Sequence, residues 1–288
     1  KYNTEVRQKT AQILLTALNG NTVESTAQVS DATLARVHLL VYADGRKKPH
    51  ISIRQIEATI ADAVVTWRDR LRAALADNFG EERGADLFET YGGIFPLAYE
   101  EDHDAQQTCH DIQRLDALLT GDASALKAFD LHIEPRGPVA GIRFRVFRFD
   151  DPIALSDALP LLENLGLRVI NERPYHLRTG ASPTWIQDFE VVPIVDKSAA
   201  ELRAVVHKLA IGFATQLQGH AEADGFNRLI LSAGLDSRNV ALIRAYAKYL
   251  LQLGLPFSQS YLEDILADHS DFASALVSWF ESRFDPSS

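Results

Sequence analysis

The segment from residue 141 to residue 192 constrains the fold most, because its hydrophobic period changes from that of a strand to that of a helix and back. A strand-like run, GIRFRVFRF (141–149), leads through Asp150-Asp151-Pro152 into a helical run whose leucines share one face. Two further strand-like runs follow, LRVINERPY (167–175) and TWIQDFEVV (184–192). Alternation is typical of strands, and spacing by three and four is typical of a helix that covers a sheet. The segment therefore predicts a β-α-β-β unit.

The first part of the chain follows a related pattern. A helical run over residues 2–18 precedes two strand-like runs, at 22–30 and 34–43. A long helix is predicted next, over residues 52–79. Apolar residues occupy both faces of the second strand, which predicts a central strand. We interpret residues 1–80 as a partial unit of the same kind that lacks its first strand.

The other boundaries rest on chain breakers and on helical periodicity. Residues 81–134 alternate between helical and irregular patterns and are predicted to form a helical connector. The run IEPRGPVAG (133–141) is the expected linker to the second unit, which covers residues 135–195. Residues 196–288 are predicted to be helical throughout, with short loops that favour a bundle.

Composition argues against several classes of function. The chain has 288 residues, of which 46% are hydrophobic and 24% charged, and its formal net charge is -10. An acidic surface repels phosphate groups, so neither nucleic acid nor a membrane is expected as a partner. The single cysteine, Cys109, allows no internal disulfide and fits a reducing cytoplasm. The chain begins at Lys1 and contains no methionine, so we expect a piece of a longer protein.

None of the common catalytic motifs occurs in the sequence. It has no G-x-G-x-x-G after a strand, no G-x-x-x-x-G-K-[ST], no H-E-x-x-H, no C-x-x-C and no G-x-S-x-G. The acidic run 100–104, with Cys109 and His110 nearby, is the best metal candidate by composition. Adjacent residues on a helix point apart, so a solvated acidic surface is favoured instead. We predict no catalytic, cofactor-binding or metal-binding residue in this chain.

Arginines alternate along the first strand of the second unit. The charged residues expected on the sheet face opposite the helix are Arg143, Arg145, Arg168, Glu172 and either Asp188 or Glu190. Such a patch has the donors to hold a ligand carboxylate. Because carboxylates are interspersed with the arginines, a cross-strand ladder of opposite charges is the favoured interpretation. The alternation shifts at Phe147, which predicts a bulge or a strand end there.

Several longer segments resemble the large bacterial NAD-specific glutamate dehydrogenases. The strongest are NLGLRVINERPYHL (164–177) and FNRLILSAGLDSRNVALIRAYAKYLLQLGLPFSQSYLEDIL (226–266), and KYNTEVRQK (1–9) and FPLAYEEDHDA (95–105) occur in the same order as in that family. The resemblance implies that several ACT-like domains and helical motifs precede a separate catalytic domain. The chain would run from inside the second ACT-like domain, through the third, into the first helical motif.

The second unit also resembles the general ACT signature, which usually reads D-x-P-G before its helix. Asp150 and Pro152 match it, and Ile153 stands where the glycine would be. The resemblance implies an α+β fold of ACT-like (ferredoxin-like βαββαβ) units with antiparallel sheets, followed by an α-helical bundle segment. The candidate effector-binding residues are Asp150, Asp151, Pro152, Ile153, Arg143 and Arg145. The β-branched Ile153 narrows the approach of an amino acid to the helix N-terminus.

The favoured function is a non-catalytic regulatory and oligomerisation segment. The resemblance implies that the whole protein is an enzyme that converts L-glutamate, NAD and water to 2-oxoglutarate, ammonium and NADH. NAD would bind outside these residues. The expected partners are the protein's own catalytic domain, sister protomers and an amino-acid effector. A purely architectural role is an alternative within the family, and a free-standing ACT-type amino-acid sensor that controls another protein is an alternative outside it.

Overall fold

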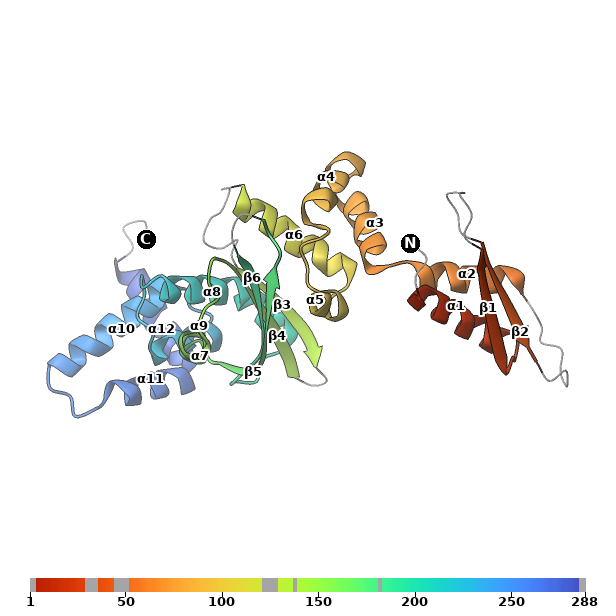
Figure 1. Cartoon of the computed structure of the whole chain (residues 1–288). Coiled ribbons are helices and arrows are strands. Elements are labelled where there is room, and N and C mark those ends of the chain that lie inside the picture. The colour runs from red at the N-terminus through yellow and green to blue at the C-terminus, as the bar shows by residue number, and fades with distance from the viewer. Residues whose placement is uncertain are drawn as a thin grey trace. The chain divides into compact units, whose positions relative to one another are not determined.

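The computed structural model describes residues 4–28, 36–43, 52–120, 129–136, 139–180 and 183–284 (Figure 1). The chain divides into two compact units. The first unit comprises Lys1–Gly92 with Asp104–Cys109, and the second comprises Gly93–His103 with His110–Ser288.

The first unit begins with two helices and a two-stranded antiparallel sheet. The elements are α1 (Thr4–Ala17), β1 (Thr22–Gln28), β2 (Arg36–Tyr42) and α2 (Ile53–Val64). The predicted helix-strand-strand-helix order is confirmed.

Strand β2 has apolar residues on both faces but one neighbour within the described residues. It pairs with β1, and Leu40 and Tyr42 on its outer face are more than half exposed. The expectation of a central strand is therefore not met in the described part of the chain.

The long helix predicted over residues 52–79 is in fact two helices, α2 and α3 (Trp67–Phe79). Thr66 begins α3 with a capping box, in which its hydroxyl accepts from the amide of Asp69 at 3.2 Å and its own amide donates to the Asp69 carboxylate at 3.1 Å. Such reciprocal bonds satisfy two amide donors that a helix start leaves free. The helix α4 (Glu81–Tyr91) follows, and its predicted helical character is confirmed.

The second unit contains a four-stranded antiparallel sheet in the order β3-β4-β6-β5. Its strands are β3 (Phe129–Arg136), β4 (Val139–Phe149), β5 (Leu167–Leu177) and β6 (Thr184–Pro193). Helix α7 (Leu155–Asn164) connects β4 to β5, and α8 (Ala199–Leu217) follows β6. The predicted antiparallel α+β architecture is confirmed. The element order differs from the predicted βαββαβ order, because the edge strand that pairs with β4 is β3, which comes before the unit's first helix and not after its last.

Strand β3 lies where the sequence predicted the end of a connector and a linker. Residues 133–136 belong to β3 and residues 139–141 to β4, so the expected linker 133–141 is wrong. Pro135 and the nearby glycine suggested a loop. Proline is tolerated at a sheet edge because an edge strand has one side without ladder bonds.

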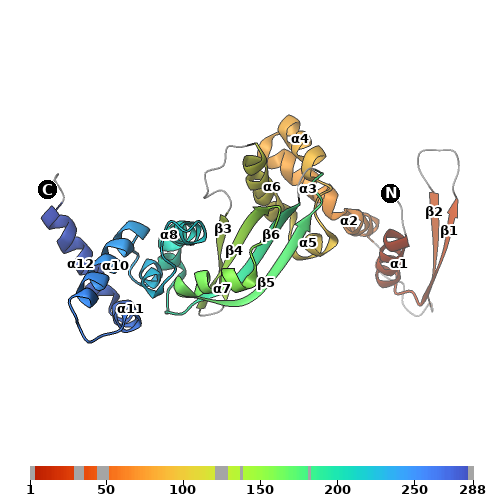
Figure 2. The same ribbon diagram turned by 60° about the vertical axis from the view of Figure 1, so that its left-hand side comes forward.

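The core of the second unit lies on the sheet face that α7 and α8 cover (Figure 2). Phe144 on β4 and Phe189 on β6 lie opposite each other and are fully buried. Phe213 on α8 contacts Phe144 edge to face, with ring centroids 4.7 Å apart. Gly166 ends α7 with a φ of 79°, as the sequence predicted.

A β-bulge at Ile170 decides which residues of β5 face which way. The pairing of β5 with β6 shifts between Val169 and Asn171, so that Glu172 lies opposite Phe189, on the α7–α8 face. The expectation that Glu172 shares a face with the arginines is therefore wrong. No register shift occurs between Ile142 and Phe149 of β4, and the strand continues to Phe149, so neither the bulge nor the strand end that was predicted at Phe147 is found there.

The chain ends in a helical region, as predicted. Its longer helices are α10 (Ser237–Gln252), α11 (Gln259–Asp268) and α12 (Ser270–Phe284), after the short α9 (Arg228–Ser232). No helix in the described ranges combines the length and the apolar character needed to cross a membrane.

Candidate functional site: a buried charge cluster and a closed loop

The sheet face opposite α7 and α8 carries a buried ionic cluster centred on Arg145. Arg145 is 1% exposed and lies directly across the β4–β6 pair from Asp188. Its Nε is 3.5 Å from the Asp188 carboxylate, and its Nη1 is 3.0 Å from the carboxylate of Asp111 on α6 (Ala105–Leu119). Arg143 lies opposite Glu190 and is 3.5 Å from Asp188. The favoured ladder of opposite charges is therefore present, with Asp111 as an additional member.

Helix α5 (Leu97–Asp102) supplies an aromatic layer to the same cluster. The Tyr99 hydroxyl donates to Asp111, and the Tyr99 ring stacks on His103 with centroids 4.2 Å apart. A ring nitrogen of His103, Nε2, lies 3.2 Å from the Asp188 carboxylate. His103 is buried, whereas its neighbours Glu101 and Asp104 are exposed, so the expected solvated acidic surface is correct except at the histidine.

At the border of the cluster, Asp102 joins α5 to strand β5. It accepts from Arg173 at 2.5 Å and from the Tyr175 hydroxyl at 2.7 Å. Hydrogen bonds from Arg173 and from Tyr175 lower the pKa of Asp102. Burial and the bond to Asp102 raise the pKa of Tyr175. Asp102 is thus ionised and Tyr175 neutral at neutral pH.

The pKa values of the two buried carboxylates of the cluster, Asp188 and Asp111, are shifted in opposite directions. Burial alone would raise the pKa of Asp188, but the hydrogen bond with His103 and the charge of Arg145 outweigh it, so the pKa lies below its usual range. For Asp111, burial outweighs Arg145 and raises the pKa. The cluster therefore holds α5 and the adjoining part of α6 against the sheet through charges that are already paired.

The loop that leads into α7 is closed by Gln187 of β6. The Gln187 side chain accepts from the Ile153 amide at 2.6 Å and donates to the Ile153 carbonyl at 2.9 Å. Ile153 is 7% exposed, and Asp150 takes a left-handed φ of 66°. The indole of Trp185 donates to the Asp150 carbonyl at 3.2 Å. Sequence reasoning missed Gln187, whose only signal was an amide on the apolar face of a strand.

The structure separates the six predicted effector-binding residues into two groups. Asp150, Asp151, Pro152 and Ile153 form the loop that Gln187 binds, and Gln187 lies opposite Val146 on the α7–α8 face. Arg143 and Arg145 lie on the other face and are engaged by carboxylates. The two groups do not converge on one ligand position.

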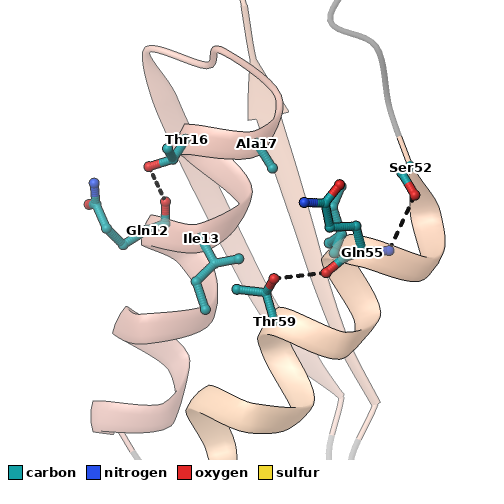
Figure 3. Close-up of a pocket in the computed structure, with 8 residues that line it drawn as sticks. Gln12, Ile13, Thr16, Ala17, Ser52, Gln55 and Thr59 are labelled. Carbon is teal, nitrogen blue, oxygen red and sulfur yellow. Dashed lines mark hydrogen bonds between the residues drawn. The ribbon is translucent and has the colours of Figure 1, made fainter.

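The first unit has a groove between α1 and α2 (Figure 3). Its volume is about 410 Å³, and no charged side chain lines it. The hydroxyl of Thr16 donates to the Gln12 carbonyl at 3.0 Å, and that of Thr59 donates to the Gln55 carbonyl at 2.8 Å. These two hydroxyl protons are therefore used within their own helices, and the side-chain amides of Gln12 and Gln55 are among the polar groups that also line the groove.

Metal ions and dinucleotides each bind to recognisable arrangements of residues. The described residues contain no group of three or more His, Cys, Asp or Glu side chains that could hold a metal ion. Both sheets within the described ranges are antiparallel, and the sequence lacks the glycine-rich turn that seats a dinucleotide pyrophosphate. The pattern of the second unit is that of an ACT-type domain.

Comparison with known proteins agrees with that class. Family models of glutamate dehydrogenase match four successive regions: the ACT2 domain at residues 1–68, helical motif 2 at 74–118, the ACT3 domain at 128–203 and helical motif 3 at 221–286. The terminal helices therefore match the third helical motif, and the predicted first helical motif is corrected.

Relatives named NAD-specific glutamate dehydrogenase align with nearly the whole chain. Those of Halomonas elongata, Pseudomonas aeruginosa and Mycobacterium tuberculosis are 36%, 33% and 32% identical over 99%, 98% and 99% of it. The aligned region is 17%, 17% and 18% of their respective lengths. The chain belongs to this family of large NAD-specific glutamate dehydrogenases and carries ACT and helical-motif segments of it.

Proposed function

We propose that this chain is a non-catalytic regulatory and oligomerisation segment of an NAD-dependent glutamate dehydrogenase. The whole protein converts L-glutamate, NAD and water to 2-oxoglutarate, ammonium and NADH, and a catalytic domain elsewhere in the polypeptide binds NAD. The observation that supports the proposal is the ordered succession of ACT and helical-motif matches along the chain. We favour domain boundaries at residues 80 and 195, and we move the start of the second ACT-like unit from residue 135 to residue 129, so that it includes β3.

The charge cluster supports a mechanical role for the second unit. Arg145 ties together one strand pair and two helical elements, through Asp188, Asp111 and the residues of α5. Within the described residues the Arg145 Nε has ion-pair contact with Asp188 but no hydrogen-bond partner. The ion pairs of the network fix the position of α5 and of the adjoining part of α6 relative to the sheet. In the whole enzyme, a displacement of α5 or α6 would therefore move the sheet of the second unit with it.

Regulation requires a ligand or partner that binds two conformations of this segment with different affinity. The loop of Asp150–Ile153 is the candidate place for an amino-acid effector, and the Gln187 clamp on Ile153 argues against it. We therefore favour contacts with the catalytic domain and with sister protomers, in the cytoplasm, over binding of a free amino acid.

Calorimetry with a panel of amino acids on the purified chain separates this role from that of a free-standing sensor. We expect no heat of binding at micromolar to millimolar concentrations. Micromolar binding that is lost in Asp150→Ala would favour the amino-acid sensor. Gln187→Ala serves as the matched variant, since it frees the Ile153 backbone groups without altering the acidic residues.

A turnover assay tests the non-catalytic assignment. The purified chain, supplied with L-glutamate and NAD, is expected to produce no NADH above the rate without protein. Glutamate-dependent NADH formation by this chain alone would place an active site within these residues and end the proposal.

A further inference from the structure

The C-terminal helices expose a higher proportion of large apolar side chains than the rest of the described protein. Of the 22 large hydrophobic residues that are exposed in the described ranges, 12 lie between Tyr246 and Phe284. Trp279 is 64% exposed and Phe272 is 57% exposed. Contiguous apolar surface of this kind marks an interaction site, whereas single exposed hydrophobic residues need no explanation.

Helices α10, α11 and α12 lie together at the C-terminal end of the chain and form a groove (Figure 2). Six of the twelve exposed side chains line it: Tyr246, Leu250, Ile265, Phe272, Leu276 and Trp279. Its volume is about 380 Å³, and all of its lining residues are apolar. On α10, Tyr246 and Leu250 are four residues apart. On α12, Phe272, Leu276 and Trp279 follow at intervals of four and three.

Two such apolar stripes on neighbouring helices form a groove against which a third helix can pack. Side chains spaced by three and four form ridges on each helix, and the space between two ridges receives the ridge of another helix. Tyr246 and Phe280 bring the two helices together, with ring centroids 6.1 Å apart. Helix α12 has 15 residues, which corresponds to about four turns of contact for a docked helix.

Two carboxylates lie close in sequence to residues that line the groove, Asp271 directly before Phe272 and Asp268 two residues after Leu266. Asp268 and Asp271 flank the turn from α11 to α12 and are exposed, and no ion pair is found for either of them within the described residues. The cations of α10 beside the groove are already neutralised, Arg244 by Asp224 at 2.7 Å and Lys248 by Glu222. The two carboxylates therefore leave uncompensated negative charge close to residues that line the groove.

We propose that the groove of α10–α12 binds an amphipathic α-helix that carries Lys or Arg beside its apolar stripe, contributed by another part of the same polypeptide. The inference rests on the proposed function, because relatives of this chain are about six times its length and hold many further segments. Apolar ridges fill the groove, and the basic residues meet Asp268 and Asp271. The partner binds in the mode of a helix in a groove, with anchors at i, i+3 or i+4, and i+7.

A peptide titration on the purified chain tests the chemistry of the site. The probe is a fluorescent amphipathic helix made of Leu and Lys, and its matched control is the same peptide with Glu in place of Lys. We expect the Lys peptide to bind at least tenfold more tightly, as measured by anisotropy. Trp279→Ala and Leu276→Glu should each weaken it at least tenfold, whereas Leu97→Glu, which changes an exposed leucine outside the groove, should leave it unchanged.

Neutralising the two carboxylates isolates the charge contribution. The double variant Asp268→Asn with Asp271→Asn should reduce the preference for the Lys peptide to about threefold or less, while apolar anchoring persists. Equal binding of both peptides to the unaltered chain, or binding that the groove variants do not weaken, would overturn the proposal.

Cross-linking in the full-length protein identifies the occupant. A photoreactive amino acid at position 279 should cross-link to a basic amphipathic helix of the same polypeptide outside residues 1–288. Cross-links to residues 237–284 of a second copy would show self-association, and cross-links to another protein would show a foreign partner; either result overturns the proposal. The peptide assay needs neither NAD nor glutamate, so its failure leaves the assignment as a non-catalytic segment untouched.

Discussion

Arg145 on β4 and Asp188 on β6 face each other across the sheet with 1% and 2% of their surfaces exposed, and the Arg145 Nε lies 3.5 Å from the Asp188 carboxylate. Placing opposite charges in a protein interior costs hydration that only close pairing offsets. Here the pairing extends to Asp111 and His103, so the charged face of the sheet is closed by the chain's own residues. A sheet face built in this way suits a rigid connection between elements.

Removing the central charge should be strongly destabilising. In Arg145→Met the carboxylates of Asp111 and Asp188 would remain buried without their shared cation. We expect the free energy of unfolding to fall by about 3–5 kcal/mol, the usual cost of breaking a buried ion pair from one side. Urea denaturation followed by circular dichroism measures the change.

Arg143→Met is the matched control for that variant. Its side chain is 25% exposed, and its distances to Asp188 and Glu190 are 3.5 and 4.0 Å. We expect a loss of about 1 kcal/mol or less. Equal losses in the two variants would contradict the central role of Arg145.

The two buried aspartates should give opposite pH dependence. The folded state lowers the pKa of Asp188, so its stabilising effect is present above the unfolded pKa of about 3.9 and is lost as pH falls through the folded value. The penalty of Asp188→Asn should therefore be largest near pH 7 and shrink below about pH 4. Urea unfolding of the unaltered chain and of Asp188→Asn at several pH values measures this penalty as a function of pH.

Asp111 is the comparison, because burial raises its pKa in the folded state. The contribution of Asp111 to the free energy of unfolding is fully present below its unfolded pKa of about 3.9 and is lost as pH rises through its folded pKa. The penalty of Asp111→Asn should accordingly decrease with rising pH. Parallel curves for the two variants would show that one of these pKa directions is wrong.

Gln187→Leu should loosen the entry to α7. The substitution leaves the Ile153 amide and carbonyl without their partners at 2.6 and 2.9 Å, at the one buried residue of the loop 150–154. We expect a loss of about 1–3 kcal/mol and faster hydrogen exchange at the Ile153 amide. Gln252→Leu, at an exposed position of α10, is the control and should change neither quantity. An unchanged exchange rate at Ile153 would argue that the clamp is not formed in solution.

Cys109 should be a slow thiol in the native protein. It is 2% exposed, and burial, with a smaller effect of Asp104, raises its pKa to about 11. Because the thiolate is the reactive form, we expect reaction with Ellman's reagent at pH 8 to be at least a hundredfold slower than in urea. A native rate that matches the urea rate would mean that Cys109 is accessible.

Part of the fold followed from periodicity alone. The β-α-β-β pattern, the helix-strand-strand-helix order and the helical C-terminal region were all predictable, because burial of one face imposes a period on each element. The capping box at Thr66 has a sequence signal, the pattern Thr-x-x-Asp. The apolar stripe continues across this pattern, however, and that continuity predicted a single helix. Strand β3 was hidden because Pro135 is acceptable at a sheet edge and resembles a linker residue.

The site was less predictable. The sequence suggested that Arg143 and Arg145 belong to a ladder of charges, but the buried partners of Arg145 include Asp111, 34 residues away on α6. The bulge at Ile170 could not be located, since one extra residue in β5 changes which face Glu172 and Arg173 occupy without any local signal. Gln187 was overlooked for a similar reason, because its partners are backbone groups of a distant loop.

The sequence by itself determined the elements, their order and the family, since these depend on local periods and on long segments of similar residues. Only the tertiary structure decided which charges are paired, that the α7 entry loop is closed, and that apolar surface gathers on α10–α12. Those properties depend on distances between residues that are far apart in the chain. A period of two or of 3.6 fixes the direction of a side chain, but not what it meets.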